Sequence, residues 1–496
     1  MEEIDKNIIK SCEENGYISI IGFDADKIQE YVFATSKPIE IGGASEIVRE
    51  LNKDQIFKWI KEIDNMLTEE NVIYAHGGGG LIISPVSNAD KIIKKIEDEF
   101  HKASVTASLT AEKIEVQVKE IENNFSTIFK HLSEKLRFKK DQKLAISSYS
   151  IRIPPYFKRC GSCGVYPVTQ YDYKYRDEEE RYICDSCFNK RKKFREKILS
   201  SGLTLENIVK ENKENSEEDY LAIIYADGHN TGSILETFTL PEFREFPEKL
   251  YEISREILED TINELKLKHR YIAPVIGGDD LVLLLPAKKS ILAIRKIIDK
   301  FRTQIKFIDK LKHLSLDIGL VIASHHFPIR YLFQYVNALM KNAKRLAYQK
   351  DEKFTFDYFD YMVIKGGSPL NLSIEELRRI ELLREISHIE YRLTSKPYKW
   401  EEFNDKIIKS LEALNRFPSS QLYIVLEHLL EHPEVAKLNI MYQVARSDEW
   451  QKKLEEITGN FYSSEWESFF IKRISPTQYE TPFLDLMELY KRKVEV

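Results

Sequence analysis

Residues 272–285 read IAPVIGGDDLVLLL, two short apolar runs with two glycines and two aspartates between them. Because glycine accepts the backbone of a tight turn at little steric cost, this pattern predicts a hairpin with Gly277, Gly278, Asp279 and Asp280 at its tip. Two adjacent carboxylates repel each other unless water or a divalent cation lies between them. The pattern therefore indicates either a solvated acidic turn or a metal site.

A second apolar strand, Leu221–Tyr225, runs almost directly into Asp227. Two strand ends that carry carboxylate oxygens are what a magnesium-dependent nucleotidyl-transfer site requires. We therefore predict that Asp227, Asp279 and Asp280 are the catalytic carboxylates and that they hold two Mg²⁺ or Mn²⁺ ions. We single out no general base, since a coordinated metal ion can acidify the attacking hydroxyl.

The residues around these strand ends suit a bound nucleotide. After Asp227 the strand is expected to turn into a helix, and the backbone N–H groups of a helix start suit a triphosphate. The glycines of the hairpin leave room for a nucleotide above it. The predicted nucleotide-binding residues at these positions are Gly228, Asn230, Thr231, Gly232, Gly277 and Gly278.

The first half of the chain repeats this arrangement about 200 residues earlier. Tyr17–Phe23 is an apolar strand followed by Asp24 and Asp26, and another strand leads into the glycines 77–80. Asp26 precedes Gly77 by 51 positions, and Asp227 precedes Gly277 by 50. Each copy should continue as helix, strand and helix, with the strand of the first copy at Ser104–Leu109. This order predicts a ferredoxin-like antiparallel sheet with helices on one face.

The two copies differ at the hairpin tip. The first copy has four glycines and no carboxylate there, so it cannot assemble the same two-metal site. Glycines still allow a backbone to approach a ligand closely. We predict that the first copy binds a nucleotide through Asp24, Gly77, Gly78 and Gly79 without metal chemistry. The alternative is a purely architectural copy.

Four cysteines lie between the two copies as two CxxC pairs, Cys160 with Cys163 and Cys184 with Cys187. Four thiolates at this spacing predict a closed tetrahedral site for a structural Zn²⁺. The basic run 190–197 that follows could contact a phosphate backbone, although a solvated helix face is the simpler interpretation. The acidic stretch Glu211–Asp219 is predicted to be a linker.

The composition limits what the chain can be. At 496 residues it suits three or four domains, and 43% hydrophobic and 31% charged residues are typical of a globular protein. No apolar run is long enough to cross a membrane, and cysteines in CxxC pairs suit a reducing compartment, so we expect a cytoplasmic protein. The net charge of −6 means that any contact with nucleic acid must use local basic patches or partner subunits.

The GGDD tetrad, the Asp227 strand and the segment LDIGLVIASHH at 316–326 resemble the palm polymerase/cyclase family that includes the GGDEF cyclases. The resemblance is closest to the large polymerase-like subunit of type III CRISPR effector complexes. In that family two palms flank a zinc-binding insert and a helical domain follows. The resemblance implies an α+β fold with a first palm at 1–145, a zinc-binding domain and linker at 146–215, a second palm at 216–367 and an all-α domain at 368–496.

The resemblance also implies a function. In palm cyclases a lysine on the helix after the last core strand contacts the triphosphate, and Lys344 in NAKRLA is the best match, although a lysine on a helix can equally be a solvated residue. The implied reaction joins ATP into cyclic oligoadenylates by 3′–5′ phosphodiester bonds and releases pyrophosphate. In the family this happens when guide RNA pairs with target RNA, so the implied partners are both RNAs and the other type III subunits.

Many relatives begin with an HD nuclease domain. This sequence starts with the first palm and contains no His-Asp dipeptide, so we expect no DNase activity of that kind. Two other functions stay open. One is a stand-alone synthase of a cyclic dinucleotide or another oligonucleotide, and the other is a non-catalytic scaffold of a ribonucleoprotein.

Overall fold

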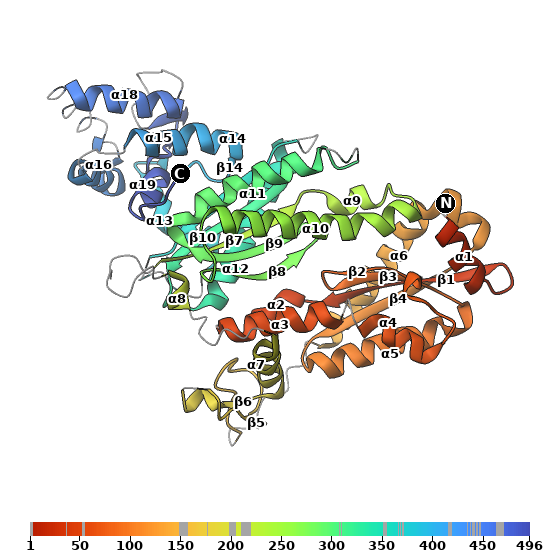
Figure 1. Ribbon diagram of the computed structural model, residues 1–496. Helices are drawn as coiled ribbons and strands as arrows, with labels where there is room; N and C mark the ends of the chain where they lie inside the picture. Colours follow the sequence, from red (N-terminus) through yellow and green to blue (C-terminus); the bar gives the residue numbers. More distant parts are fainter. Residues whose placement is uncertain are drawn as a thin grey trace.

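Figure 1 shows the computed structural model of the chain. The structure describes residues 3–147, 157–197, 205–209, 220–350, 355–365, 367, 369, 372–414, 419–462 and 471–496, except for 36, 52–54, 176, 307, 309, 434, 437, 439–441, 443, 444, 446 and 447. The predicted linker Glu211–Asp219 lies outside the described residues. The predicted domain boundaries stay predictions; the one at 145 falls inside a helix that continues to Ser147.

The first palm (red to orange in Figure 1) is built on a four-stranded antiparallel sheet in the order β2-β3-β1-β4. Its two inner strands, β1 and β3, are buried along most of their length, so they form the core of the palm. Its strands are β1 (Tyr17–Asp26), β2 (Val72–His76), β3 (Gly79–Ser84) and β4 (Ser108–Gln117). Its helices are α1 (Glu3–Cys12), α2 (Ile28–Val32), α3 (Pro38–Glu50), α4 (Ile56–Ile63), the 3₁₀ turn η2 (Glu69–Asn71), α5 (Val86–Ser104) and α6 (Val118–Ser147).

The strand predicted at Ser104–Leu109 lies further along the chain. Helix α5 continues to Ser104, Val105 has a left-handed backbone, and β4 begins only at Ser108. The second half of β4 carries several charged side chains, which hid its strand character; they are Glu112, Lys113 and Glu115. The order of elements is nevertheless the predicted one, with the strand displaced by four residues at its start.

The second palm (green to cyan) has the same core with two added strands. Its six-stranded sheet has the order β14-β11-β10-β7-β9-β8, in which β11 runs parallel to β10. The strands are β7 (Tyr220–Gly228), β8 (Ile272–Gly277), β9 (Asp280–Pro286), β10 (Leu316–Ser324), β11 (Tyr358–Val363) and β14 (Tyr398–Lys399). The helices are α9 (Thr231–Leu235), α10 (Leu240–Glu264), η4 (Ala287–Lys289), α11 (Ser290–Ile305) and α12 (Ile329–Lys350).

The two palms pack against each other with pseudo-twofold symmetry. Helix α3 of the first palm contacts β8, the edge strand of the second, and α10 of the second palm contacts β2, the edge strand of the first. The two β-hairpins meet at this axis: a side chain on Gly277 would lie 3.6 Å from the Cα of Gly77. The first hairpin therefore faces the tip that carries the two aspartates.

The cysteine-containing module consists of β5 (Gln170–Tyr171), η3 (Glu179–Arg181), β6 (Tyr182–Ile183) and α7 (Asp185–Lys197), with α8 (Leu205–Val209) following. Helix α7 packs so closely on α3 that a Cβ on Gly43 would lie 1.9 Å from the carbonyl oxygen of Lys190. Both predicted roles of the basic run are wrong for its first two members, because Lys190 and Arg191 are fully buried in this contact.

The C-terminal region contains the predicted helices but is not all-α. A four-stranded sheet in the order β12-β13-β16-β15 lies among them. Its strands have at most four residues and charged, half-exposed side chains, so no apolar run marked them in the sequence. The elements are α13 (Ile374–Leu382), β12 (Leu383–Ile386), β13 (Ile389–Arg392), α14 (Trp400–Phe403), the π-helical turn η5 (Asn404–Ile408), α15 (Lys409–Ala413), α16 (Ser419–Glu431), α18 (Asp448–Tyr462), β15 (Lys472–Ser475), β16 (Gln478–Glu480) and α19 (Phe483–Tyr490).

Among the described residues, no helix has both the length and the apolar character needed to cross a membrane.

Candidate active site

The predicted hairpin with the two aspartates is present. Gly277 pairs with Asp280, so the two-residue turn is Gly278–Asp279. Neither glycine has a positive φ, in contrast to Gly77 and Gly78 of the first hairpin, whose φ angles are 61° and 97°. Space, rather than turn geometry, favours glycine at 277 and 278, because side chains there would contact the first hairpin and Leu250 of α10.

The three predicted carboxylates come together at the ends of β7 and β9. Asp227 and Asp280 are close enough for a side-chain hydrogen bond. Asp279 adjoins the end of β7, because a Cβ on Gly228 would lie only 2.7 Å from the Cβ of Asp279. The side chain of Thr231 on α9 lies beside Asp279. Two strands and the start of a helix therefore position one acidic cluster.

Lys344 of α12 balances part of this negative charge. Its ammonium group lies 2.5 Å from Oδ2 of Asp227. Burial alone would lower the pKa of Lys344, but the Asp227 carboxylate outweighs burial and raises it. The sequence left this lysine between a triphosphate ligand and a solvated residue; the structure places it in the acidic cluster.

The electrostatics of the cluster fit a divalent cation. Burial, together with the charge of Asp227, raises the pKa of Asp279, and burial with the charges of Asp279 and Asp227 raises the pKa of Asp280 well above its usual value. No described residue donates a hydrogen bond to the buried Oδ1 of Asp280. A cation would remove both the repulsion and the unsatisfied oxygen.

The carboxylates nevertheless spread more widely than the cysteine sulfurs do. In the part of the chain that the structure describes, the four thiols are the only group of three or more possible metal ligands whose donor atoms all lie within 4.8 Å of one another. Like charges without a cation are expected to separate, and Lys344 partly takes the place of the positive charge.

The predicted phosphate-binding turn after Asp227 has a distinct geometry. Asn230 takes a left-handed backbone with φ 64° and precedes α9, which is only five residues long. Thr231 lies at the start of α9, and its hydroxyl donates to the carbonyl of Gly228. A side chain on Gly232 would meet no atom within 4 Å, so the surface there is open to a ligand.

One pair at the site was missed in the sequence. His229 Nδ1 lies 2.5 Å from Oδ2 of Asp317, and both side chains are fully buried. Asp317 is opposite Asp227 in the register of β7 and β10. The aspartate in LDIGLVIASHH was the available signal, but its position beside Asp227 depends on a strand register that the sequence does not encode locally.

The first palm has a counterpart of the Asp227–Lys344 pair, and it is not the one that spacing predicted. In the first palm, Asp24 of β1 pairs with Gly79, the first residue of β3 after the hairpin turn. In the second palm, the first residue of β9 after the turn is Asp280, and the register of β7 and β9 places it beside Asp227. Asp24, and not Asp26, is therefore the equivalent of Asp227. Lys140 on α6 forms an ion pair with Asp24.

Asp26 instead accepts hydrogen bonds from the hydroxyls of Ser108 and Thr110 on β4. The spacing comparison failed because the segments that join strand and hairpin differ by two residues in length. Helix starts agree with the register: Lys27 before α2 and Asn230 before α9 both have left-handed backbones, three residues after Asp24 and Asp227.

A cavity of about 590 Å³ lies where the palms meet, a volume typical of small-molecule sites. It is bordered by α2 and α3, by both hairpins and by α10. His76 of the first hairpin stacks on Tyr251 of α10 at one side. Its polar lining residues include Gln29, Arg49, His76, Tyr251, Lys268 and Asp280. Asp280 thus connects the cavity to the acidic cluster.

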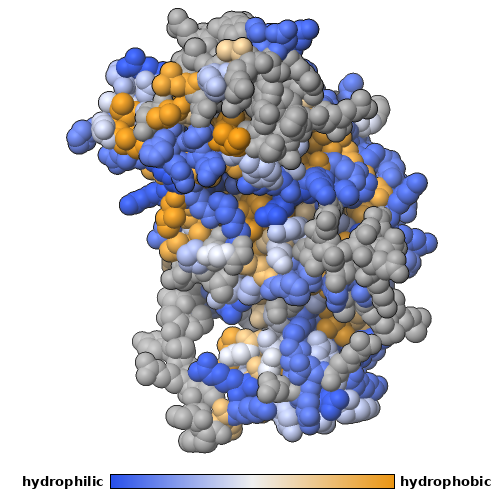
Figure 2. All heavy atoms as spheres, turned by 90° about the vertical axis from the view of Figure 1, so that its left-hand side faces the viewer, coloured by the Kyte–Doolittle hydropathy of each residue, from blue (hydrophilic) through white to orange (hydrophobic). Residues whose placement is uncertain are grey.

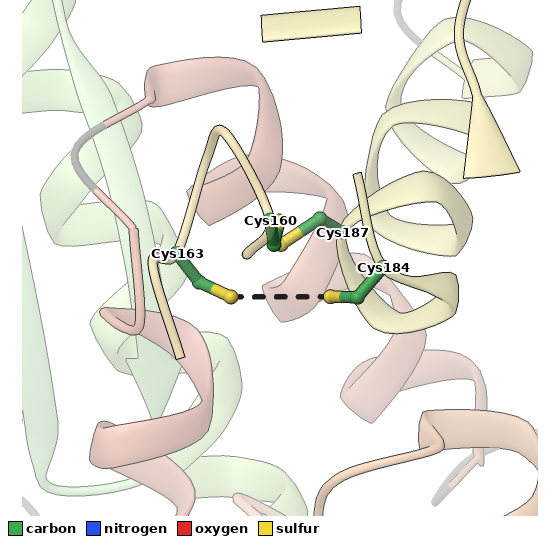
Figure 3. A group of neighbouring side chains, drawn as sticks. All are labelled: Cys160, Cys163, Cys184 and Cys187. Atoms are coloured by element: carbon green, nitrogen blue, oxygen red, sulfur yellow. Dashed lines mark hydrogen bonds between the residues drawn. The ribbon is translucent and has the colours of Figure 1, made fainter. Parts of the chain in front are cut away.

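The cysteine cluster is well suited to zinc. Figure 3 shows Cys160 and Cys163 on one loop and Cys184 and Cys187 at the start of α7, with their sulfurs directed toward one another. The Sγ atoms of Cys163 and Cys184 lie 3.9 Å apart. Tetrahedral Zn–S bonds of about 2.3 Å place sulfurs about 3.8 Å apart. The four thiols could therefore hold Zn²⁺ with little rearrangement and no open coordination position.

Comparison with known proteins agrees with this architecture. The model of the second palm domain of Cas10/Cmr2 matches residues 220–353. The chain is Cas10-like. The Csm1–Csm4 cassette in complex with AMPPNP superposes with a TM-score of 0.59 at 13% identity, covering 97% of this chain and 70% of that chain. The cassette in complex with cA4 gives 0.59 at 13%, covering 98% and 71%. Csm1 in T. onnurineus gives 0.51 at 13%, covering 97% and 70%.

No curated protein matches the sequence. At such low identity the superposed structures establish the fold of the Cas10-like chain, while the palm model relates its second palm to Cas10/Cmr2 by sequence. The predicted architecture of two palms, a four-cysteine insert and a C-terminal region with helices is confirmed.

Proposed function

We propose that this Cas10-like chain converts ATP into cyclic oligoadenylates as the large subunit of a type III CRISPR complex that target RNA activates in the cytoplasm. The observation that carries the proposal is the convergence of Asp227, Asp279 and Asp280 at the hairpin that faces the first palm. This cluster borders a cavity large enough for a nucleotide.

The relatives support the choice of substrate. Csm1–Csm4 cassettes have been solved in complex with AMPPNP, with pppApA and with cA4. These are an ATP analogue, a linear dinucleotide that retains its triphosphate, and a cyclic tetra-adenylate. In the proposed reaction a ribose 3′-hydroxyl attacks the α-phosphorus of another ATP, an O–P bond forms, and pyrophosphate leaves.

Asp227, Asp279 and Asp280 would hold the two Mg²⁺ or Mn²⁺ ions, which supply activation of the hydroxyl and neutralisation of phosphate charge when bound. The residues of the chain have separate roles. Lys344, now paired with Asp227, can turn to the triphosphate once a cation replaces it at the carboxylate. Gly228, Asn230, Thr231 and Gly232 would border the phosphates, while Gly277 and Gly278 keep the space above the hairpin free.

The first palm is proposed to bind a second nucleotide without metal ions. Lys140 and Asp24 repeat the lysine–aspartate pair, while Gly78 and Gly79 stand where the second palm has Asp279 and Asp280. Desolvation raises the pKa of Asp24 in spite of the nearby Lys140. Lys140 also lies 3.8 Å from Asp26, but this palm has glycines in place of Asp279 and Asp280. Lys140 is therefore available to bind phosphate, and Asp24, Gly77, Gly78 and Gly79 are proposed to contact this nucleotide.

Partner subunits are proposed on the C-terminal region. Figure 2 shows apolar side chains on the upper part of the molecule, where this region lies. Contiguous exposed apolar surface is commonly a site of protein association. The large apolar residues exposed in the C-terminal region are Ile380, Tyr423, Ile424, Val435, Leu438, Tyr442 and Ile474. The relatives were solved as a cassette with Csm4, which supports a protein partner for this chain as well.

The test is incubation of the purified chain with each labelled NTP and Mg²⁺ or Mn²⁺, with and without guide RNA, target RNA and partner subunits, followed by mass spectrometry. We expect cyclic adenylates to form from ATP and from no other nucleotide, and we expect target RNA to increase their amount. Products from another nucleotide would favour the stand-alone synthase. No product from the fully assembled complex would contradict the proposal and favour a scaffold.

Replacing Lys140 with alanine is expected to weaken nucleotide binding at the first palm by about tenfold, the usual effect of losing one charged hydrogen bond. Calorimetric titration with a non-hydrolysable ATP analogue should show two nucleotides per wild-type chain and only one tight site in the variant. Lys139→Ala is the control, because the adjacent Lys139 donates to the carbonyl of Ala111 and pairs with Glu97. Equal affinity of Lys140→Ala and wild type would exclude this role.

A further inference from the structure

The first palm reaches the acidic cluster of the second through the short helix α2 (Figure 1). The side chain of Gln29 donates a hydrogen bond from Nε2 to the hydroxyl of Tyr225. Tyr225 lies on β7 two residues before Asp227, so both side chains are on the same face of the sheet. A residue of one palm thus binds the strand that carries a predicted metal ligand of the other.

These hydrogen bonds form a chain with a defined direction. Asn337 Nδ2 on α12 donates to Oε1 of Gln29 over 3.3 Å, which leaves the amide N–H of Gln29 for the oxygen of Tyr225. The register of β7 and β9 brings Tyr225 and Asp280 together as diagonal neighbours on the same face of the sheet. Because the Tyr225 oxygen accepts from Gln29, its hydroxyl proton is available to the Asp280 carboxylate nearby. The chain runs from Asn337 through Gln29 and Tyr225 to Asp280.

The surrounding residues keep this series of polar contacts in place. Tyr225 is only 3% exposed, so its hydroxyl has no access to alternative partners in bulk water. Phe33, next to α2, stacks on Phe333 of α12, one helical turn from Asn337. Lys344, which pairs with Asp227, is two turns further along the same helix. Helix α12 therefore holds both ends of the arrangement.

This series of polar contacts has no counterpart among the described residues across the pseudo-twofold axis. Helices α2 and α9 begin at the same distance from Asp24 and Asp227, so Gln29 corresponds to Gly232, and Tyr225 corresponds to Gly22. Two glycines cannot form the connection. Among the described residues, these polar contacts run only toward the palm that has the carboxylates.

We propose that Gln29 of the first palm positions the Asp280 carboxylate of the second palm for cation binding, acting through the Tyr225 hydroxyl. This inference rests on the proposed function, since it assigns a positioning role at the same site. The Tyr225 hydroxyl would hold one side of the Asp280 carboxylate and so leave Oδ1, to which no described residue donates, for the cation. Gln29 and Tyr225 are positioning residues and need not touch the substrate.

The test measures Mn²⁺ binding to the full chain by electron paramagnetic resonance without nucleotide, with Asp279→Ala/Asp280→Ala as the baseline. Tyr225→Phe and Gln29→Ala are each expected to weaken the site-specific affinity by about tenfold, as is usual for groups that orient a metal ligand. The double variant should bind no more weakly than Tyr225→Phe alone, because both changes break the same chain.

A second glutamine–tyrosine hydrogen bond elsewhere in the protein provides a matched control. Gln117 Nε2 donates to the hydroxyl of Tyr17 over 3.0 Å at the opposite end of β1. Gln117→Ala and Tyr17→Phe should leave Mn²⁺ binding unchanged, and thermal unfolding of all variants would reveal any loss of folding.

Unchanged Mn²⁺ affinity in Tyr225→Phe, additive losses in the double variant, or a wild type that binds no better than the baseline would each overturn the inference. A wild type that binds Mn²⁺ through this chain of contacts but makes no oligoadenylate would contradict the proposed function alone.

Discussion

Replacing Asp279 and Asp280 together with alanine is expected to abolish oligoadenylate synthesis, with a loss of at least about a thousandfold. Metal ions contribute several kcal/mol to phosphoryl transfer, and about 4 kcal/mol corresponds to this factor. The double variant keeps Asp227, but the remaining neighbour of Asp227, Asp317, is fully buried and paired with His229. Product formation from labelled ATP, followed by mass spectrometry, measures the effect.

The same variant should be at least as stable as the wild type in the absence of metal ions. Burial and mutual repulsion raise the pKa of both carboxyls in the folded chain. A raised carboxyl pKa means that the folded state binds protons more tightly than the unfolded state, so these groups cost stability as the pH rises through that pKa. Alanine removes this cost, and thermal unfolding in a chelator at pH 7 should show no decrease in Tm.

Asp260→Ala with Glu264→Ala is the matched control. It removes the same two charges from the second palm, but at surface ion pairs of α10 with Lys300. Its synthesis should equal that of the wild type. Full activity of Asp279→Ala/Asp280→Ala would refute the assignment of the site, whereas lost activity with a lowered Tm would point to misfolding rather than to metal chemistry.

Much of the fold was accessible from the sequence because its signals are local. The hairpin of the second palm and the CxxC pairs are each set by a few consecutive residues, and both are present in the structure. The internal repeat then predicted the order of elements in both palms. The short charged strands β12 and β15 have no such local signal, so the C-terminal sheet was missed.

The candidate site was accessible in part. Asp227, Asp279 and Asp280 follow from strand ends, but the equivalence of Asp24 with Asp227 required the strand register, and counting residues selected Asp26 instead. Gln29 lies 196 positions from Tyr225, and no pattern within either segment relates them. Contacts between domains depend on how the surfaces of the folded domains pack, and the hydrophobic periodicity of a single sequence does not reveal this packing.

The contact between the cysteine module and the first palm is also a contact between domains that no local pattern predicts. A substitution in this contact has the second large expected effect. Glu40 on α3 is fully buried and accepts a hydrogen bond from Arg191 Nε at 2.6 Å and from the hydroxyl of Ser162, between the first two cysteines. Arg191 also contacts Asp172 at 3.3 Å. Desolvation alone would lower the pKa of Arg191, but the Glu40 carboxylate outweighs it and raises this pKa.

Glu40→Ala is therefore expected to destabilise the contact between α3 and α7 by about 3–5 kcal/mol, because it leaves a buried guanidinium with an incomplete set of partners. Hydrogen–deuterium exchange of residues 38–50 and 185–197 measures this locally, which matters because a chain of several domains need not unfold in one step. Both segments should exchange faster, and the retention of zinc should fall.

Lys193→Ala is the control from the same helix contact. Lys193 forms an ion pair with Glu50 across α7 and α3, but both side chains are partly exposed, so its loss should cost only about 0–1 kcal/mol. Equal exchange in Glu40→Ala and Lys193→Ala would mean that the buried pair is no stronger than the surface pair. Because α3 also borders the cavity between the palms, a large effect of Glu40→Ala would extend the influence of the cysteine module to the walls of that cavity.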